Sequence, residues 1–461
     1  MTTASNTKVA VPGPVAGTRW TEAMVRQIGS FAYMWAWPMV NLHNRRVAFA
    51  QVPEHGLVGG VMPAAPLNNV TMLSDYAPPE QRFIATPNQD VVYGFGILSL
   101  DREPVVVQVP DFGDRFWVYQ LGDQRTDGFG DLGSMYGFGP GCYLLVGPGW
   151  DGDTPEGITG MFRSPTDLGV LIPRIFMDDT AEDRAAIGPL VAQVMAYPLS
   201  QFTGEPRTMD WTGLPTFPAP QTSGGAEVRW VDPDTFFDVL PQVLAEVPPL
   251  AGEEALYGLL GALVEHAADN PGVRSVLTQV AQDAEATLVG PLFEYRNEGV
   301  DAGNGWGVLR NAARFGTDYV TRVAAAKANI FANRPEEATY YFTDVDGNGD
   351  RLHGGTYTLT FAAGQLPPDH GFWSLTVYDR YHFFVPNEID RYSLGTKNRD
   401  LHRDDAGALT IHVGPRPPDD GAANWLPCPD AAEFSLILRA YWPTDAVTDG
   451  DWTPPAVTRT H

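Results

Sequence analysis

The sequence predicts a mixed β/α protein of several domains, in which two antiparallel β-sandwich or jelly-roll units flank a helical segment. Three observations predict this class. Strand-like runs separated by turn residues follow one another about every 10 to 15 residues in the first third of the chain. Apolar residues recur at helical spacing in the middle, and strand-like runs return from about Thr339. A chain of 461 residues is long enough for about three domains.

The N-terminal third is expected to hold one long helix, several strands and a closing helix. The first helix starts at Trp20 and runs along an aromatic stripe to Trp35, where Pro38 kinks or ends it. A second helix is expected over about 182–197, with Thr180 as its N-cap. The strands between them are expected at 91–100, 105–109, 115–121 and 142–146.

The middle of the chain is predicted to be helical, and the C-terminal part is predicted to form strands. Asp232 and Asn270 each precede a proline, which is a typical start of a helix. The leucines between these two starts recur at helical spacing. The later strands are expected at 356–361, 372–379, 409–413 and 434–442.

These elements divide the chain into five parts. The segment 201–225 is rich in Pro, Thr and Gly and lacks periodicity, which is typical of a linker. The parts are a flexible tail (1–18), an N-terminal β-rich domain (19–200), the linker (201–225), a helical segment (226–335) and a C-terminal β-sandwich domain (336–461).

Charge and composition exclude several classes of partner. The chain carries 56 acidic and 30 basic side chains, a net charge of -26, which disfavours nucleic acid and anionic membranes. The most apolar run spans 31–40, about half the length of a membrane helix. With two cysteines and no visible secretion signal, the sequence predicts a cytoplasmic protein and leaves homo-oligomerisation open.

Two long stretches resemble a known bacterial family. TPNQDVVYGFGILSLDREPVVVQVPDFGDRFWVYQLGD and GCYLLVGPGWDG lie in the first β region, and PEEATYYFTDVDGNGDRLHGGTYTLTF, LPPDHGFWSLTVYD, NWLPCPD and LRAYWP lie in the last. They are similar to the two halves of the DUF1254/DUF1214 family, over roughly 85–152 and 335–443. The resemblance implies two β-sandwich or jelly-roll units with a helical insertion, and assigns no reaction.

The first candidate site lies where a loop enters a strand. Asn88, Asp90 and Tyr93 place a carboxamide, a carboxylate and a phenol at the mouth of a sheet. Asp90 would act as a general base if burial raised its pKa, with Tyr93 assisting. The alternative is an Asx turn in which Asn88 and Asp90 bond to nearby backbone.

A second candidate group shares one face of the strand that follows Arg115. Alternation places Arg115, Trp117, Tyr119 and Asp123 on that face. Arg115 would bind an anion or stabilise an oxyanion, and the other three would bind substrate. A salt bridge of Arg115 inside a sandwich is the competing interpretation.

The C-terminal candidates lie at strand ends. Tyr378 and Asp379 end one strand, Trp425 lies two residues before Pro427, and Arg439 lies in the last strand. We expect these residues to line the rim of a substrate pocket.

The sequence predicts neither a metal site nor a cofactor. The nine histidines form no HExxH or HxH pattern, and no Walker A loop, GxSxG elbow or strand-borne GxGxxG is present. The acidic loop that starts at Asp344 has Gly355 where a calcium loop needs a bidentate glutamate, and is interpreted as a turn.

Two functions remain open from the residues alone. The first is a cofactor-independent hydrolase, lyase or isomerase that acts on a small organic molecule in a pocket between the β units by acid/base chemistry. The second is a noncatalytic small-molecule binding or scaffold protein that uses the same side chains.

Overall fold

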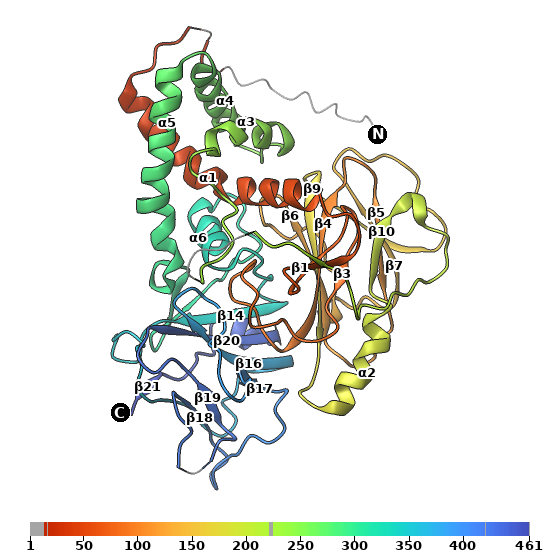
Figure 1. The fold of residues 1–461 in the computed structure, drawn as a ribbon, viewed down its shortest axis with the longest axis vertical. Coiled ribbons are helices and arrows are strands. Elements are labelled where there is room, and N and C mark those ends of the chain that lie inside the picture. Colours follow the sequence, from red (N-terminus) through yellow and green to blue (C-terminus); the bar gives the residue numbers. More distant parts are fainter. Residues whose placement is uncertain (1–12, 16, 221–224, 420, 461) are drawn as a thin grey trace.

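The chain folds into one helical layer and two β-rich units. The computed structural model describes residues 13–15, 17–220, 225–419 and 421–460. Helices gather at one end, one β-rich unit lies beside them, and a second β-rich unit lies below (Figure 1). The mixed class is confirmed. Most of the predicted tail, and residues 221–224 of the predicted linker, lie outside the described residues.

The N-terminal β unit consists of two four-stranded sheets that share one apolar core. The first sheet has the order β3 (Thr71–Met72), β4 (Val91–Ser99), β9 (Leu168–Phe176), β6 (Trp117–Asp123). The second has the order β10 (Met195–Pro198), β5 (Val105–Val109), β7 (Gly141–Val146), β8 (Ile158–Arg163). A small sheet joins β11 (Thr216–Phe217), β1 (Gly56–Val58) and β2 (Met62–Ala64).

The C-terminal β unit also pairs two sheets over an apolar core. Its larger sheet has the order β12 (Val300–Gly303), β13 (Trp306–Val308), β14 (Ala338–Thr343), β20 (Phe434–Pro443), β16 (Asp369–Asp379), β17 (Ser393–Gly395). The smaller has the order β19 (Trp425–Pro427), β18 (Leu409–Gly414), β15 (Tyr357–Phe361), β21 (Thr458–Arg459). Most pairs are antiparallel as predicted, but β1–β11, β7–β8 and β18–β19 are parallel.

The helical layer combines the first helix with those from the middle of the chain. The helices are α1 (Glu22–Phe49), α3 (Phe236–Glu246), α4 (Glu254–Ala268), α5 (Pro271–Ala284) and α6 (Tyr319–Asn329). Two further helices, α2 (Ala181–Val191) and α7 (Asp445–Thr448), lie in the β units. Short turns are η1 (Ser134–Tyr136), η2 (Leu199–Gln201), η3 (Glu285–Val289), η4 (Gly290–Phe293) and η5 (Tyr295–Asn297).

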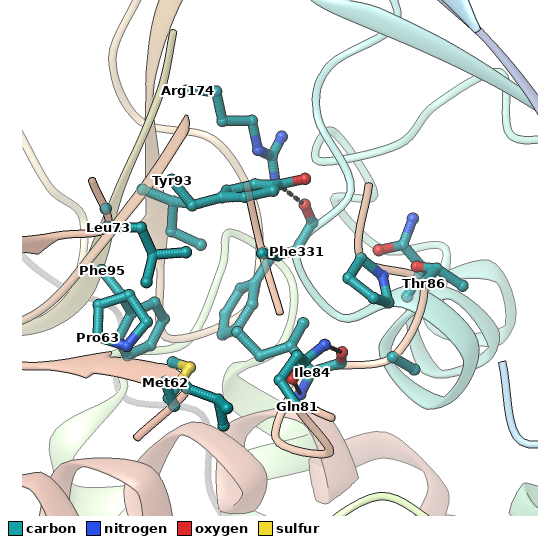
Figure 2. Close-up of a pocket in the computed structure, with 17 residues that line it drawn as sticks. Met62, Pro63, Leu73, Gln81, Ile84, Thr86, Tyr93, Phe95, Arg174 and Phe331 are labelled. Atoms are coloured by element: carbon teal, nitrogen blue, oxygen red, sulfur yellow. Dashed lines mark hydrogen bonds between the residues drawn. The ribbon is translucent and has the colours of Figure 1, made fainter. Parts of the chain in front are cut away.

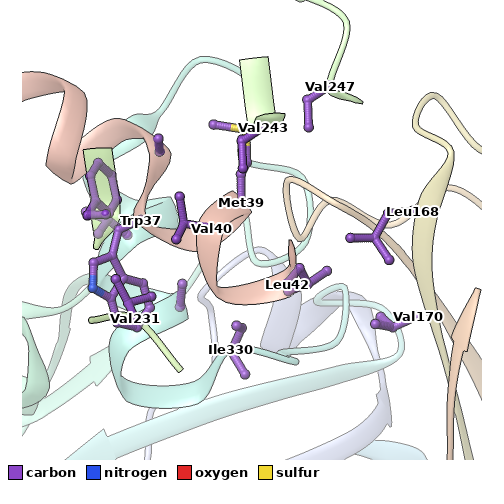
Figure 3. Packing of buried hydrophobic residues seen from close by; sticks show 14 of the residues in the cluster. Trp37, Met39, Val40, Leu42, Leu168, Val170, Val231, Val243, Val247 and Ile330 are labelled. Atoms are coloured by element: carbon purple, nitrogen blue, oxygen red, sulfur yellow. The ribbon is translucent and has the colours of Figure 1, made fainter. Parts of the chain in front are cut away.

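Helix α1 ties the helical layer to the N-terminal sheet. It continues through Pro38, because the residues on both sides of the proline are buried by their neighbours. Met39 and Leu42 of α1 lie between Val243 of the α3 helix and Val170 of strand β9 (Figure 3). Although α1 is first in the sequence, it therefore packs with the helical segment as well as with the β-rich domain predicted to contain it.

Several predicted ends move by a few residues for physical reasons. Asn270 caps α5 as expected, since its side chain accepts from the amides of Gly272 and Val273. The start predicted at Asp232 is wrong, because α3 begins at Phe236. Helix α2 is capped by Thr180 but ends at Val191, and β10 then pairs with β5. No helix within the described ranges is both long and apolar enough to cross a membrane.

Candidate functional site

A cavity of about 70 Å³ lies between the sheet that contains β4 and β9, the loop before β4, and the residues around the end of α6 (Figure 2). This volume is room for a small organic molecule or a few waters. Most of its walls are apolar. They include Met62, Pro63, Leu73, Ala77, Ile84, Ala85, Phe95, Ile172 and Phe331.

Strand alternation and register place the polar end of this cavity. Tyr93 and Phe95 of β4 lie on one face of the sheet, since residues two apart in a strand point the same way. Arg174 of β9 is directly opposite Tyr93 in the antiparallel register, and Ile172 lies two residues before it. This face of the sheet looks toward the helical layer, where Phe95 and Ile172 join the core that α1 contributes to.

Arg174 has few partners for a buried cation. The residue is 5% exposed, and Nη2 donates to the carbonyl of Phe331 at 2.9 Å (Figure 2). Nε and Nη1 have no hydrogen-bond partner among the described residues. No Asp or Glu of the described residues forms an ion pair with Arg174. A buried charge in this state is costly unless something else binds it.

Three further polar groups line the same cavity and make no hydrogen bond to another described residue through their side chains. The Thr86 hydroxyl is buried and unpaired, and neither the Tyr93 hydroxyl nor the Asn329 amide bonds to another described residue. Burial raises the pKa of Tyr93, so the phenol stays protonated and can donate. Four hydrogen-bonding groups therefore border one small space.

Thr86 holds a backbone conformation that is rare for a β-branched residue. Its φ of 54° lies in the left-handed region, which costs of order 1–3 kcal/mol. Its amide donates to the carbonyl of His382 at 2.8 Å, and its carbonyl accepts from Arg439 at 2.9 Å. The C-terminal β unit thus holds the rim of the cavity in place.

Arg439 and Tyr378 complete that support. Arg439 donates to the Thr376 hydroxyl at 3.0 Å and to the Tyr378 hydroxyl at 2.6 Å. Tyr378 in turn donates to the carbonyl of Pro87. Both were predicted as rim residues, and the structure brings them against the loop beside Tyr93.

Asp90 lies in a separate buried cluster. Its two carboxylate oxygens accept from Ser374 at 2.6 Å and from Ser393 at 3.1 Å. Lys397 lies 3.7 Å from the carboxylate, donates to the Gln89 carbonyl, and has its pKa lowered by burial. The Asn88 half of the predicted Asx turn is present, since the Asp90 amide donates to Asn88 Oδ1 at 3.1 Å, but the Asp90 carboxylate bonds to the distant serines and not to nearby backbone.

Comparison with known proteins places two parts of the chain in families. Residues 67–198 match the family described as protein of unknown function DUF1254, and residues 337–445 match protein of unknown function DUF1214. The chain contains both domains. The resemblance seen in the sequence is thereby confirmed, and a search of curated proteins found no match.

One solved structure shares the fold over nearly the whole chain. The crystal structure of the VPA0106 protein from Vibrio parahaemolyticus has a TM-score of 0.62 and 18% identity, over 95% of this chain and 100% of that one. An uncharacterized protein from Burkholderia cenocepacia has a TM-score of 0.44 and 12% identity, over 95% of both chains. At this identity the first likeness shows the fold alone.

In the DUF1254 domain, the other predicted residues lie away from the cavity. Arg115 pairs with both oxygens of Asp183, so the salt bridge of the competing interpretation is present, although its acid lies in helix α2 and not inside a sandwich. Trp117 and Tyr119 are buried in the core between the two sheets. Asp123 accepts from the amides at the turn that follows β6, and burial raises its pKa to about 7.

In the DUF1214 domain, Asp379 and Trp425 are also engaged elsewhere. Asp379 accepts from the amides of Tyr381 and Phe383 in the turn after β16. Trp425 donates to the Gly414 carbonyl at 2.8 Å in the smaller sheet. Asn88 donates to the Tyr441 hydroxyl at 2.5 Å and is buried beside the cavity loop.

Sequence reasoning missed Arg174, Thr86, Phe331 and Asn329. A signal for Arg174 was present, because it is the one charged residue in the run LGVLIPRIF. The described residues contain no group of three or more His, Cys, Asp or Glu side chains placed to hold a metal ion.

Proposed function

We propose that the protein binds a small organic molecule in the cavity beside β4 and β9, with an apolar body against Leu73, Phe95 and Phe331 and a polar group at Arg174. The observation that supports this most directly is the convergence of unpaired hydrogen-bonding groups on an otherwise apolar space. Apolar walls supply affinity, and the polar groups orient the ligand.

This geometry favours binding over acid/base catalysis by Asp90. The Asp90 carboxylate does not line the cavity, and both of its oxygens already accept hydrogen bonds. Among the residues that line the cavity, Tyr93 is the one group suited to exchange a proton. A hydrolase, lyase or isomerase reaction here would therefore depend on Tyr93, with Arg174 as the oxyanion donor.

The experiment tests whether a larger side chain at the rim of the cavity prevents ligand binding. Ile84 is partly buried and lines the cavity, while its backbone amide and carbonyl bond to Gln81 at 3.2 and 2.6 Å. Ile84→Trp adds volume without removing these bonds, and Ile84→Leu conserves volume as the matched control. Benzoate, benzamide, 4-methylpentanoate and 4-methylpentanamide serve as probes in ligand-observed NMR.

We expect at least one probe to bind the wild-type protein and Ile84→Leu, and to lose at least about tenfold in affinity in Ile84→Trp. Equal binding by the tryptophan variant would place the ligand elsewhere. Binding of none of the four probes would contradict the proposal.

The remaining sequence expectations complete the proposal. Each β unit pairs two sheets over an apolar core, which supports a sandwich-like architecture for both. The two free cysteines support a cytoplasmic location, and the charge of -26 supports the absence of nucleic-acid and anionic-membrane partners. Cell fractionation that finds the full chain outside the cytoplasm would contradict that location.

A further inference from the structure

We infer that the ligand of this cavity is an organic anion, with a carboxylate or similar oxyanion bound by Arg174 and a small apolar body. This inference rests on the proposed binding function and specifies its substrate class. It goes beyond size and polarity, because it assigns the ligand a charge.

The first support is a comparison with the other buried arginines. Four of them lie within 4.0 Å of a carboxylate, and a fifth donates to three oxygens. The four ion pairs are Arg45–Glu227, Arg125–Glu253, Arg322–Asp127 and Arg334–Asp131, and the fifth residue is Arg439. Arg174 is the buried arginine of the described chain with a single hydrogen bond and no carboxylate.

The second support is that arginine cannot reduce the free-energy cost of its burial by becoming neutral. A buried acid or lysine can become neutral, but the guanidinium stays protonated at any physiological pH. Its charge must therefore be balanced by an anion or by many oxygen acceptors. The cavity beside Arg174 is where such an anion has room.

The third support is the character of the neighbouring groups. The Tyr93 and Thr86 hydroxyls and the Asn329 amide can all donate hydrogen bonds, and none bonds to another described residue. No Asp or Glu is among the lining residues, so no protein carboxylate competes for these donors. A carboxylate, which has two oxygens and about four acceptor positions, matches this set of donors.

The apolar walls argue against an inorganic anion as the intended ligand. Leu73, Phe95, Ile84 and Phe331 offer no polar atom from their side chains, and a hydrated phosphate would leave this surface unused. An organic acid uses both ends of the cavity. Inorganic phosphate is therefore included as a competing probe.

The test compares each carboxylate with its carboxamide, which keeps the shape but not the charge. In the wild-type protein at neutral pH, we expect benzoate or 4-methylpentanoate to bind at least about tenfold more tightly than its amide. Arg174→Met should abolish this preference. Arg174→Lys should retain part of it, since an ammonium keeps the charge without the planar donor array.

Tyr93→Phe gives a smaller, independent readout. It should weaken carboxylate binding by about threefold while leaving the order of acid over amide intact. If an amide binds as tightly as its acid in the wild-type protein, the charge inference is wrong, whereas binding lost in Ile84→Trp would still support the proposed function. Phosphate that displaces benzoate at equal concentration would also contradict an organic anion as the ligand.

Discussion

The Arg174 cavity and the Asp90 cluster are both buried and both lie near the C-terminal β unit, but they differ in how completely their polar groups are paired. In the Asp90 cluster, Ser374 and Ser393 occupy the carboxylate oxygens and Lys397 balances the charge. Beside the cavity, two nitrogens of Arg174 have no hydrogen-bond partner in the described part of the chain. A complete network stabilises the junction of the two β units, whereas an incomplete one beside a cavity is typical of a ligand site.

Breaking the complete network should have the largest effect. Lys397→Met leaves the buried Asp90 carboxylate without its cation, and we expect a loss of about 3 to 5 kcal/mol in the free energy of unfolding. Urea denaturation measures this loss. Because the two residues interact, the double variant with Asp90→Asn should lose less than the sum of the single variants. A loss below about 1 kcal/mol for Lys397→Met would mean that the cluster is not structural.

Glu298 is a buried acid, and it extends the comparison to an unpaired group of the opposite charge. Its replacement should have an intermediate, pH-dependent effect on the free energy of unfolding. It is 5% exposed, Oε1 has no partner among the described residues, and burial raises its pKa to about 8. The folded protein therefore binds this proton more tightly than the unfolded chain, so Glu298 should reduce stability as pH rises from about 5 to above 8.

Glu298→Gln removes that titration. The variant and the wild-type protein should differ little in their pH response below pH 5, and by pH 8.5 the variant should have gained up to about 4 kcal/mol relative to the wild-type protein. Thermal unfolding across this pH range measures the difference. A constant difference at every pH would show that Glu298 keeps an ordinary pKa.

Removing the unpaired arginine should have the smallest effect on stability. Arg174→Met replaces an unbalanced buried charge by an apolar side chain and loses one hydrogen bond, so the two contributions oppose each other. We expect the free energy of unfolding to stay within about 1 kcal/mol of the wild-type value, in the same urea experiment. A loss above about 3 kcal/mol would show that Arg174 is a structural residue, in contrast to the proposed role in ligand binding.

The parts of the fold that the sequence predicted are those with a local signal. Strands β16 and β20 and the Asn270 cap of α5 all appear within a few residues of where the pattern placed them. Strand β9 was missed although it is central, because Pro173 interrupts its apolar run. The structure accommodates Pro173 where the pairing of β9 with β4 is interrupted, between Leu171 and Arg174.

The candidate site was predicted in part. Tyr93 lines the cavity, and Tyr378 and Arg439 hold its rim, so the loop-to-strand junction and the strand ends were informative positions. The predicted face of β6 did not indicate the site, because Trp117 and Tyr119 point toward the core of the sandwich-like unit. Alternation tells which side chains share a face, but not which face meets the core.

The sequence by itself determined the β, α, β order of the chain, its acidic character and most of its local elements, because these depend on residues close together along the chain. Only the tertiary structure decided which charges are paired. Asp90 meets Ser374, 284 residues away, while Arg174 meets a single carbonyl 157 residues away. Such contacts depend on how the layers pack, and no local pattern records whether a buried charge will find its partner in the protein or must take it from a ligand.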